Sequence, residues 1–261
     1  MDISFIILNY RSAKLVKNCI NSLIESRVNL NYEIIIIDNN SNDPYWPKLK
    51  KIFPSAIFIE NEKNGGYGYG NNQGIKIAKG KYVVILNPDI YVLANAMETM
   101  YQFMENKTSC SIVGPKLLNV DGSAQQTYGR FPDWYLPFYR RSLLGQTKKG
   151  KEWLNNYFYE YKQFNEPTKV DWVFGACLFM RKDDILKVGG FDERYFMYIE
   201  DTDLCRQIAD MGKEVYYLPQ ASLIHLHKRD SAEFKGLRGL LRPLGRQHLL
   251  SWWKFCWKYK N

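Results

Sequence analysis

The sequence has few of the residues that mark disulfide or structural metal chemistry. It contains three histidines and five cysteines in 261 residues, and the cysteines show no metal-type spacing. The cysteines lie mostly among apolar residues, which predicts buried, reduced thiols and a cytoplasmic location. No run of about 18 apolar residues is present, so we expect no transmembrane helix. The first residues, Met1 to Ser4, lack a basic region followed by an apolar one, so we expect no secretory signal.

The net charge of +9 is concentrated at one end of the chain. Residues 228–261 carry nine basic and two acidic side chains, so they account for most of the excess. A basic surface can meet nucleic acid, an anionic membrane or a phosphorylated substrate. A nucleic-acid-binding protein is the weakest of these interpretations because only the charge favours it, and we expect no nucleic-acid partner.

Apolar runs alternate with amphipathic segments through the first 104 residues. The predicted strands are residues 3–8, 33–37, 56–60 and 82–86. The predicted helices are residues 14–26, 47–53, 70–78 and 94–104. This order is typical of an α/β protein with a mainly parallel sheet flanked by helices.

The pattern changes in the second half of the chain. Residues 110–118 and 214–218 read as strands, and residues 183–188 and 201–211 as helices. Residues 128–168, rich in aromatics, proline and charge, read as a long and partly helical excursion. We predict one domain over residues 1–228, with halves 1–118 and 119–228, and a basic, amphipathic helical tail over residues 229–261.

Polar residues follow each of the first four predicted strands. They are Asn9, Tyr10, Arg11, Asp38, Asn64, Gly66, Asn87 and Asp89. Loops are often polar, but four such ends at one edge of a parallel sheet favour a ligand cleft there. Residues 64–74 are dense in glycine and include Asn71. They predict a flexible loop that lets the backbone approach a ligand and leads into a helix, or else a plain turn.

Carboxylates and histidines gather at two later points. Glu200, Asp201 and Asp203 open a predicted helix, where acidic residues suit the helix dipole and where a general base could also be tuned. His225 and His227 end a strand-like segment. One interpretation is purely structural: these histidines lie at the end of a partly buried strand. The other is that His225 joins Asp89 in holding Mg²⁺ or Mn²⁺, because oxygen and imidazole ligands suit such cations.

Short motifs spread over residues 3–230 give a joint pattern. They are Leu8-Asn9-Tyr10, Ile37-Asp38-Asn39-x-Ser41, Asn64-x-Gly66-Tyr67-x-x-Gly70-Asn71-Asn72-x-Gly74, Leu86-Asn87-Pro88-Asp89, Val113-Gly114-Pro115-Lys116-Leu117, Asp171-Trp172-Val173-x-Gly175-Ala176, Gly189-Gly190-Phe191-Asp192-Glu193, Glu200-Asp201-x-Asp203-Leu204 and His225-x-His227. The pattern resembles the family-2 inverting glycosyltransferases of the GT-A fold, most closely their bacterial rhamnosyltransferase-like branch.

The resemblance implies a nucleotide-sugar site on the first half of the sheet and an acceptor site on the second. The nucleotide-sugar side would comprise Asn9, Tyr10, Arg11, Asp38, Asn64, Gly66, Asn71, Asn87 and Asp89. The acceptor side would comprise Trp172, Gly175, Ala176 and Glu200. Asp89 matches the last aspartate of the family's Asp-x-Asp metal motif, in which Asn87 here replaces the first. Asp201 matches the catalytic base, and Glu200 would orient it or contact the acceptor.

The resulting hypothesis is an inverting glycosyltransferase that uses a nucleotide-sugar donor, with dTDP-L-rhamnose as the first candidate and UDP-sugars as the second. Its acceptor would be a lipid-linked bacterial surface glycan. Asp201 would act as general base, and a metal at Asp89 and His225 would assist departure of the diphosphate. The alternative is a catalytically inactive nucleotide-sugar-binding or scaffold protein.

The tail mixes basic residues with leucine and tryptophan. Such a segment suits an anionic membrane surface and predicts a peripheral protein on the inner face of the cell membrane. The alternative is a helix that packs on the domain or forms a homodimer contact.

Overall fold

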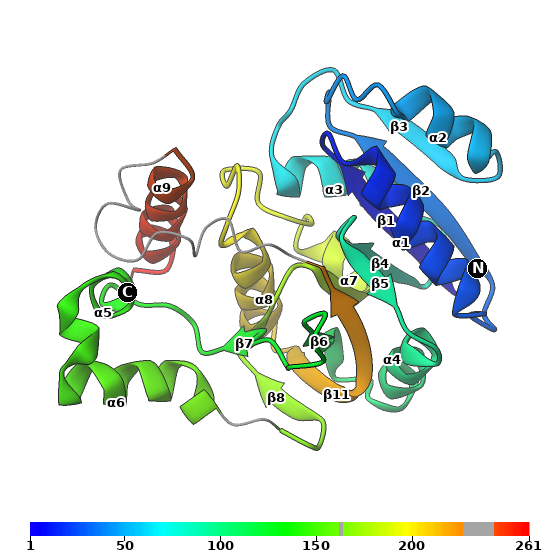
Figure 1. The fold of residues 1–261 in the computed structure, drawn as a ribbon. Helices are drawn as coiled ribbons and strands as arrows, with labels where there is room; N and C mark the ends of the chain where they lie inside the picture. The colour runs from blue at the N-terminus through cyan, green and yellow to red at the C-terminus, as the bar shows by residue number, and fades with distance from the viewer. Residues whose placement is uncertain (162–163, 227–242, 261) are drawn as a thin grey trace.

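The computed structural model describes residues 1–161, 164–226 and 243–260, and its centre is one mixed sheet (Figure 1). Within these residues, nine strands belong to the sheet, in the order β3-β2-β1-β4-β10-β6-β11-β5 with β8 paired to β11. The strands are β1 (Ile3–Asn9), β2 (Tyr32–Asp38), β3 (Ile57–Glu60), β4 (Tyr82–Leu86), β5 (Ile90–Val92), β6 (Cys110–Leu118), β8 (Thr168–Val170), β10 (Cys177–Arg181) and β11 (Glu214–His225). A separate pair is formed by β7 (Tyr128–Gly129) and β9 (Trp172–Val173).

Helices cover both faces of the sheet, as the alternating pattern predicts. They are α1 (Ala13–Glu25), α2 (Trp46–Ile52), α3 (Tyr67–Ile77), α4 (Ala96–Asn106), α5 (Leu136–Arg141), α6 (Lys148–Tyr157), α7 (Lys182–Lys187), α8 (Glu200–Asp210) and α9 (Pro243–Lys258), with short 3₁₀ turns η1 (Leu143–Gln146) and η2 (Tyr159–Tyr161). One core joins α1, α2 and α4 to the sheet, and a second core joins α3, α7 and α8 to it. The strands between these layers are apolar almost throughout because both of their faces are buried.

The first four strands in the chain are parallel, which brings their carboxyl ends to one edge. β1 pairs in parallel with both β2 and β4, and β2 pairs in parallel with β3. The second half is mixed: β10 is antiparallel to β4 and β6, and β5 is antiparallel to β11. The short strand β5 is absent from the sequence-based prediction. β11 is longer than predicted because a bulge between Leu218 and Ser222 lets it continue to His225.

The glycine-dense segment becomes helical three residues earlier than the predicted start at residue 70. Helix α3 begins at Tyr67, so Gly68, Gly70 and Gly74 lie inside it. A Cβ at Gly70 would stand 2.4 Å from Leu8 Cδ1, and one at Gly74 would stand 2.7 Å from Ile6 Cγ2. These glycines therefore let α3 approach β1 closely.

The predicted excursion is helical, and the C-terminal helix packs on the domain. α5, η1 and α6 follow β7 and enclose a small core of Leu136, Tyr157 and Phe158. α9 buries Ser251, Phe255 and Cys256, and this face meets the buried ring of Tyr195. The predicted boundary at residue 228, residues 229–242 of the predicted tail, and His227 lie outside the described residues, so the domain division stays a prediction.

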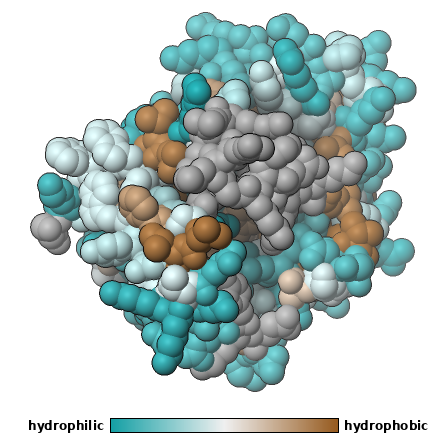
Figure 2. All heavy atoms as spheres, turned by 60° about the vertical axis from the view of Figure 1, so that its left-hand side comes forward, coloured by the Kyte–Doolittle hydropathy of each residue, from teal (hydrophilic) through white to brown (hydrophobic). Residues whose placement is uncertain are grey.

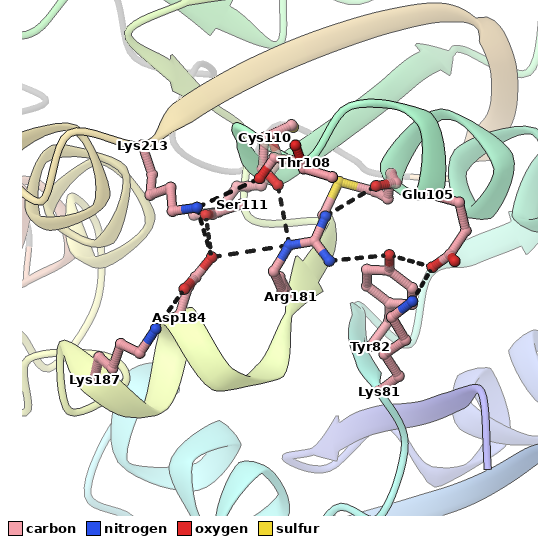
Figure 3. A network of polar contacts seen from close by, with 12 residues as sticks. Lys81, Tyr82, Glu105, Thr108, Cys110, Ser111, Arg181, Asp184, Lys187 and Lys213 are labelled. Atoms are coloured by element: carbon pink, nitrogen blue, oxygen red, sulfur yellow. Dashed lines mark hydrogen bonds and ion pairs between the residues drawn. The ribbon is translucent and has the colours of Figure 1, made fainter.

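A polar network ties the amino end of β4 to its neighbours (Figure 3). Arg181 on β10 donates to the carbonyl oxygen of Met104 at 2.9 Å and to the hydroxyl of Tyr82 at 3.3 Å. Its Nε also lies 3.8 Å from Asp184, which accepts a 2.6 Å hydrogen bond from Ser111. The network thus links β4, β6, β10, α4 and α7 at the edge of the sheet opposite the carboxyl ends of the parallel strands.

All five cysteines are buried and free, as the sequence predicts. Burial raises the pKa of the Cys110 and Cys256 thiols to about 12.

Candidate active site

The carboxyl ends of β1 and β2 are joined by a buried polar network. The Asn9 side chain donates to Asp38 Oδ1 at 2.6 Å and to Ser41 Oγ at 3.2 Å. Asp38 also accepts hydrogen bonds from the backbone and hydroxyl of Ser41. The next residues border this network: Tyr10 is exposed, and Arg11, with a left-handed φ of 55°, donates from Nε to the Ser41 carbonyl oxygen at 3.3 Å. The two strand ends therefore form a rigid floor with an exposed tyrosine and arginine at its rim.

Asn39 extends this floor to the third loop. Its amide donates to Asn64 Oδ1 at 2.8 Å and to the Gly66 carbonyl oxygen at 3.0 Å. Gly66 has a φ of +94°, and a Cβ there would lie 2.1 Å from the Phe196 carbonyl oxygen. Only glycine fits this position, which brings the start of α3 against the segment that precedes α8.

Two side chains from the first two turns of α3 belong to the site. Asn71 is fully buried, and its Nδ2 donates to the Tyr67 carbonyl oxygen at 3.1 Å, while its Oδ1 has no hydrogen-bond partner among the described residues. The Tyr67 hydroxyl donates to the Gly175 carbonyl oxygen at 2.6 Å. The pKa of Tyr67 is raised well above its ordinary value by burial and then by the nearby charges of Glu200, Asp201 and Asp89. Tyr67 therefore stands among the carboxylates that the sequence singled out.

The turn after β4 brings Asp89 to His225. The backbone N–H of Asn87 donates to the Ala176 carbonyl oxygen at 2.9 Å, and the N–H of Leu226 donates to the Asp89 carbonyl oxygen at 2.9 Å. β5 then pairs with β11, with Ile90 opposite His225. As a result, Asp89 Oδ2 lies 3.4 Å from His225 Nε2.

The Asp89–His225 pair has the chemistry of a partial metal site. His225 is 2% exposed, and its Nδ1 lies 2.9 Å from Gln125 Oε1. An amide oxygen in this position favours a proton on Nδ1, which leaves the Nε2 lone pair directed toward Asp89. No group of three histidine, cysteine or acidic side chains that could hold a metal occurs in the described part of the chain. The pair fits a cation that takes its remaining ligands from substrate phosphates, as Mg²⁺ commonly does.

The acidic pair lies at the first turn of α8. Asp201 Oδ2 accepts the Gly175 N–H at 2.7 Å, and Oδ1 accepts the Thr202 N–H at 2.6 Å. A Cβ at Gly175 would stand 3.1 Å from Asp201 Oδ2, so the missing side chain lets this carboxylate contact the backbone. Glu200 is buried, and its Oε2 has no hydrogen-bond partner among the described residues.

The pKa values of the two carboxyls are set by different balances of burial, charge and hydrogen bonding. The pKa of Glu200 is raised well above its ordinary value by burial and then by the charge of Asp201. The pKa of Asp201 is also raised by burial, but hydrogen bonds from Gly175 and Thr202 oppose that effect. Glu200 is thus the group that keeps its proton to higher pH, and Asp201 is the one that ionises first.

The predicted acceptor residues fall into two groups. Gly175 and Ala176 lie between the acidic pair and the Asn87 turn, as described above. Trp172 instead donates from Nε1 to the Arg130 carbonyl oxygen at 2.6 Å, and its ring packs toward Tyr157 of α6. Its described contacts position the α5–α6 excursion, and its assignment to the acceptor stays a prediction.

Three residues of the site were not singled out from the sequence. Tyr67 and Asn39 belong to motifs of the joint pattern, but neither has a role assigned from the sequence. Gln125 belongs to a turn whose pairing with β11 no local pattern reveals. A search for polar residues next to the predicted strand ends would have found Asn39 alone.

The fold and these residues define an α/β protein with a carboxylate-lined site at the carboxyl ends of its parallel strands. Residues 4–189 match Glycosyl transferase family 2, and the chain belongs to this family, as its motifs predict. Residues 155–229 also match a family described as the N-terminal domain of galactosyltransferase. The protein is therefore a glycosyltransferase.

Relatives support this assignment along most of the chain. The chain is 29% identical over 247 residues to rhamnosyltransferase WbbL of Escherichia coli, covering 84% of each protein. It is 27% identical over 209 residues to N-acetylglucosaminyl-diphospho-decaprenol L-rhamnosyltransferase of Mycobacterium tuberculosis, covering 76% of this chain and 67% of that protein.

Solved structures share the fold at low sequence identity. GalNAc-T7 with UDP, GalNAc and Mn²⁺ gives a TM-score of 0.66 at 17% identity, covering 88% of this chain and 44% of that one. Residues 1–349 of Staphylococcus aureus TarS in complex with UDP give 0.59 at 16% identity, covering 87% of this chain and 61% of that one. The predicted GT-A fold is thereby confirmed, although the chain spans less than half of the first of these solved chains.

Proposed function

We propose that the protein transfers a sugar, with inversion, from a nucleotide-sugar donor to a hydroxyl of a lipid-linked bacterial surface glycan. The two rhamnosyltransferase relatives support dTDP-L-rhamnose as the first donor to test. UDP-sugars come second, since UDP is present in both of the solved structures that share the fold.

The observation that carries this proposal is the state of Asp201. Its carboxylate, at the start of α8, accepts hydrogen bonds from the N–H groups of Gly175 and Thr202, next to a glutamate whose pKa is raised well above its ordinary value by burial and by the charge of Asp201. A single ionised carboxylate is what inversion in one displacement needs, because no sugar–enzyme intermediate has to form. The acceptor oxygen bonds to the anomeric carbon, the bond from that carbon to the diphosphate oxygen breaks, and Asp201 takes the hydroxyl proton.

The donor would lie along the parallel half of the sheet. Asn9, Tyr10, Arg11 and Asp38 would bind the base and ribose, and Asn64, Gly66 and Asn71 would line the path to the diphosphate. The buried Oδ1 of Asn71 has no hydrogen-bond partner among the described residues, which supports this role, because a buried amide oxygen of this kind favours a ligand that donates to it. Asn87 and Asp89 would border the diphosphate itself.

Asp89 and His225 would hold a divalent cation, Mg²⁺ or Mn²⁺. When bound, such an ion would neutralise negative charge on the leaving diphosphate. Gln125 would keep His225 in the tautomer that binds metal. Glu200, kept protonated, could donate a hydrogen bond to the acceptor beside Asp201.

The acceptor proposal also gives the outer face of α9 a role. This helix buries Ser251 and Phe255 but exposes Leu250, Trp253 and Trp257. Figure 2, in which the side with α5, α6 and α9 comes forward, shows apolar patches at the surface among hydrophilic ones. We infer that this side meets the anionic inner surface of the cell membrane, where aromatic residues and lysines are favoured.

A second copy of the chain is the alternative partner. No helix in the described part of the chain is both long and apolar enough to span the bilayer.

The experiment is a binding panel followed by a transfer assay. Thermal shifts with dTDP-rhamnose, UDP-sugars and free nucleotides, with and without Mn²⁺ or Mg²⁺, identify the donor. The best donor is then assayed for transfer by the wild type and by Asp201→Asn. We expect the variant to bind the donor with unchanged affinity and to lose about 1,000-fold or more in kcat, since it cannot accept the proton. Turnover by Asp201→Asn at the wild-type rate would remove Asp201 from the role of base. A wild type that binds donors and transfers none would favour the inactive binding protein.

A further inference from the structure

The segment that leads into the acidic pair has a strained backbone. Tyr198 and Ile199 both have a φ of 70°, and Ile199 directly precedes Glu200. A β-branched residue in this left-handed region is a genuine outlier. Such strain persists only where the surrounding structure fixes it. The contacts that fix residues 191–199 therefore also decide how α8 begins.

One side of this segment is held by α3. Asn72 accepts the Phe191 N–H at 2.9 Å and donates to the Phe191 carbonyl oxygen at 2.8 Å. The Tyr67 N–H donates to the Phe196 carbonyl oxygen at 2.9 Å. These bonds tie the segment to the proposed donor side of the site.

The other side is held by α9, which lies next to it in Figure 1. Lys254 Nζ donates to the Arg194 carbonyl oxygen at 2.7 Å, and Ser251 Oγ donates to the Met197 carbonyl oxygen at 2.8 Å. Lys258 Nζ donates to Asp192 Oδ2 at 2.8 Å. Three successive turns of α9 thus contact one short segment at three points.

Lys258 also reaches α8. Its Nζ lies 2.9 and 2.8 Å from the two carboxylate oxygens of Asp203, a residue with no exposed surface. Asp203 accepts further hydrogen bonds from Tyr195 and Gln207, both at 2.9 Å. Burial raises the pKa of Asp203, and the ammonium group of Lys258 opposes that effect. One cation therefore joins the start of the strained segment, through Asp192, to the helix that follows it, through Asp203.

We propose that Lys258 is a positioning residue for the transfer reaction: it fixes the 191–199 segment against α8 and so sets the direction of the Asp201 carboxylate. The inference rests on the proposed role of Asp201 as base. It makes α9 a part of the catalytic apparatus, although the helix contributes no group to the reacting atoms.

The test compares Lys258→Met with Lys258→Arg and with a matched control, Lys260→Met, which removes an exposed lysine two residues further on. A shift of about 1 Å in a catalytic group can cost about 100-fold, so we expect a loss of that order in kcat for Lys258→Met. The KM for the donor should change less than kcat, because Asn72 and Tyr67 of α3 hold the donor side of the segment through bonds that do not involve Lys258. Lys258→Arg keeps the cation and should stay within about fivefold of the wild type.

Hydrogen exchange supplies a readout that needs no substrate. Amides of residues 192–203 should exchange faster in Lys258→Met than in the wild type, while those of α1 stay unchanged. If Lys258→Met does not fold, Ser251→Ala replaces it, since that variant leaves no buried charge unpaired. It should raise exchange at residues 195–200 and lower kcat by about fivefold.

Three results would overturn the inference: unchanged exchange at residues 192–203, faster exchange with an unchanged kcat, or an equal effect of Lys260→Met. If the wild type transfers no sugar from any donor, the proposed function fails on its own, and the exchange measurement still tests how Lys258 holds the segment.

Discussion

Glu200 and Asp201 are neighbours in sequence that differ in what their carboxyls contact. Asp201 has two backbone donors. Glu200 is buried beside the charge of Asp201, and its Oε2 has no hydrogen-bond partner in the part of the chain that the structure describes. Burial and the charge of Asp201 raise the pKa of Glu200 well above its ordinary value, which favours the protonated carboxyl, and glutamine is a close copy of that form. We expect Glu200→Gln to keep kcat within about threefold at pH 7, whereas Glu200→Ala should lose more than about tenfold. A loss in Glu200→Gln as large as in Asp201→Asn would contradict this division of roles.

The raised pKa of Glu200 also has a consequence for stability. A carboxyl whose pKa is higher in the folded than in the unfolded protein stabilises the fold below its ordinary pKa. That contribution is lost as the pH rises through the folded value. Urea unfolding of the wild type between pH 5 and pH 9 should therefore show a component that falls with pH and that is missing in Glu200→Gln. Parallel pH profiles for the two proteins would contradict the prediction.

Gly66 offers a test of the contact between α3 and the 191–199 segment. Gly66→Ala would place a Cβ 2.1 Å from a backbone oxygen at a φ of +94°. We expect a loss of about 2–3 kcal/mol in the free energy of unfolding, because the backbone at residue 66 and the backbone at Phe196 cannot move apart without a cost in free energy. Gly122→Ala is the matched control, since Gly122 has a φ of +82° with no atom within 4 Å of the added Cβ. It should cost about 1 kcal/mol, and equal losses in denaturant unfolding would show that φ alone matters.

At the scale of single elements, helix α3 shows where local sequence reasoning stops short. The sequence predicts a helix only from residue 70, because glycine disfavours helices and the residues before it read as a loop, whereas α3 begins at Tyr67. The helix forms because Gly70 and Gly74 let it press against β1, a gain that only the tertiary structure reveals. The parallel strands, by contrast, were predictable from their apolar runs, since burial on both faces leaves a continuous signal in the sequence.

Helix α9 carries a prediction about the membrane. Its outer face exposes Trp253 and Trp257, which stack at 5.8 Å, while Ser251 and Phe255 stay buried. Trp253→Gln with Trp257→Gln removes the exposed rings and leaves the buried face intact. We expect flotation with vesicles rich in anionic lipid to fall by about tenfold or more, because each buried ring contributes on the order of 1–2 kcal/mol.

The control for that experiment changes two exposed apolar residues of other helices, Ile24→Gln and Ile77→Gln. Unchanged flotation of the tryptophan variant would defeat the membrane proposal. A change in its oligomeric state on size-exclusion chromatography would favour the second copy as the partner.

At the scale of the whole molecule, the proposed reaction and a stabilising polar network lie at opposite edges of the sheet. The Arg181 network lies at one edge and the proposed reaction at the other. Arg181→Met would leave the Met104 carbonyl and the buried Asp184 with fewer partners, so we expect about 2–4 kcal/mol less stability and an unchanged kcat. Lys187→Met, which removes a largely exposed cation from Asp184, should cost at most about 0.5 kcal/mol. A fall in kcat in the folded Arg181→Met protein would contradict this separation.

The direction and pairing of the strands decide which parts of the site could be predicted. The strand ends near Asn9, Asp38 and Asp89 could be grouped, because parallel strands end at one edge. The contact between Asp89 and His225 depends on the pairing of β5 with β11 and on the bulge within β11, and no local pattern specifies either. The link from Lys258 to Asp203 joins two segments whose only shared sequence feature is complementary charge.

The burial of all five cysteines has a practical consequence. All five native thiols are buried, and burial raises the pKa of Cys110 and Cys256 to about 12. Because the thiolate is the reactive form, the folded protein should react very little with maleimide. A single cysteine introduced on the surface of α9 could then carry a fluorophore in an otherwise native chain. That label would report, in real time, when the helix meets lipid and when the segment beneath it moves.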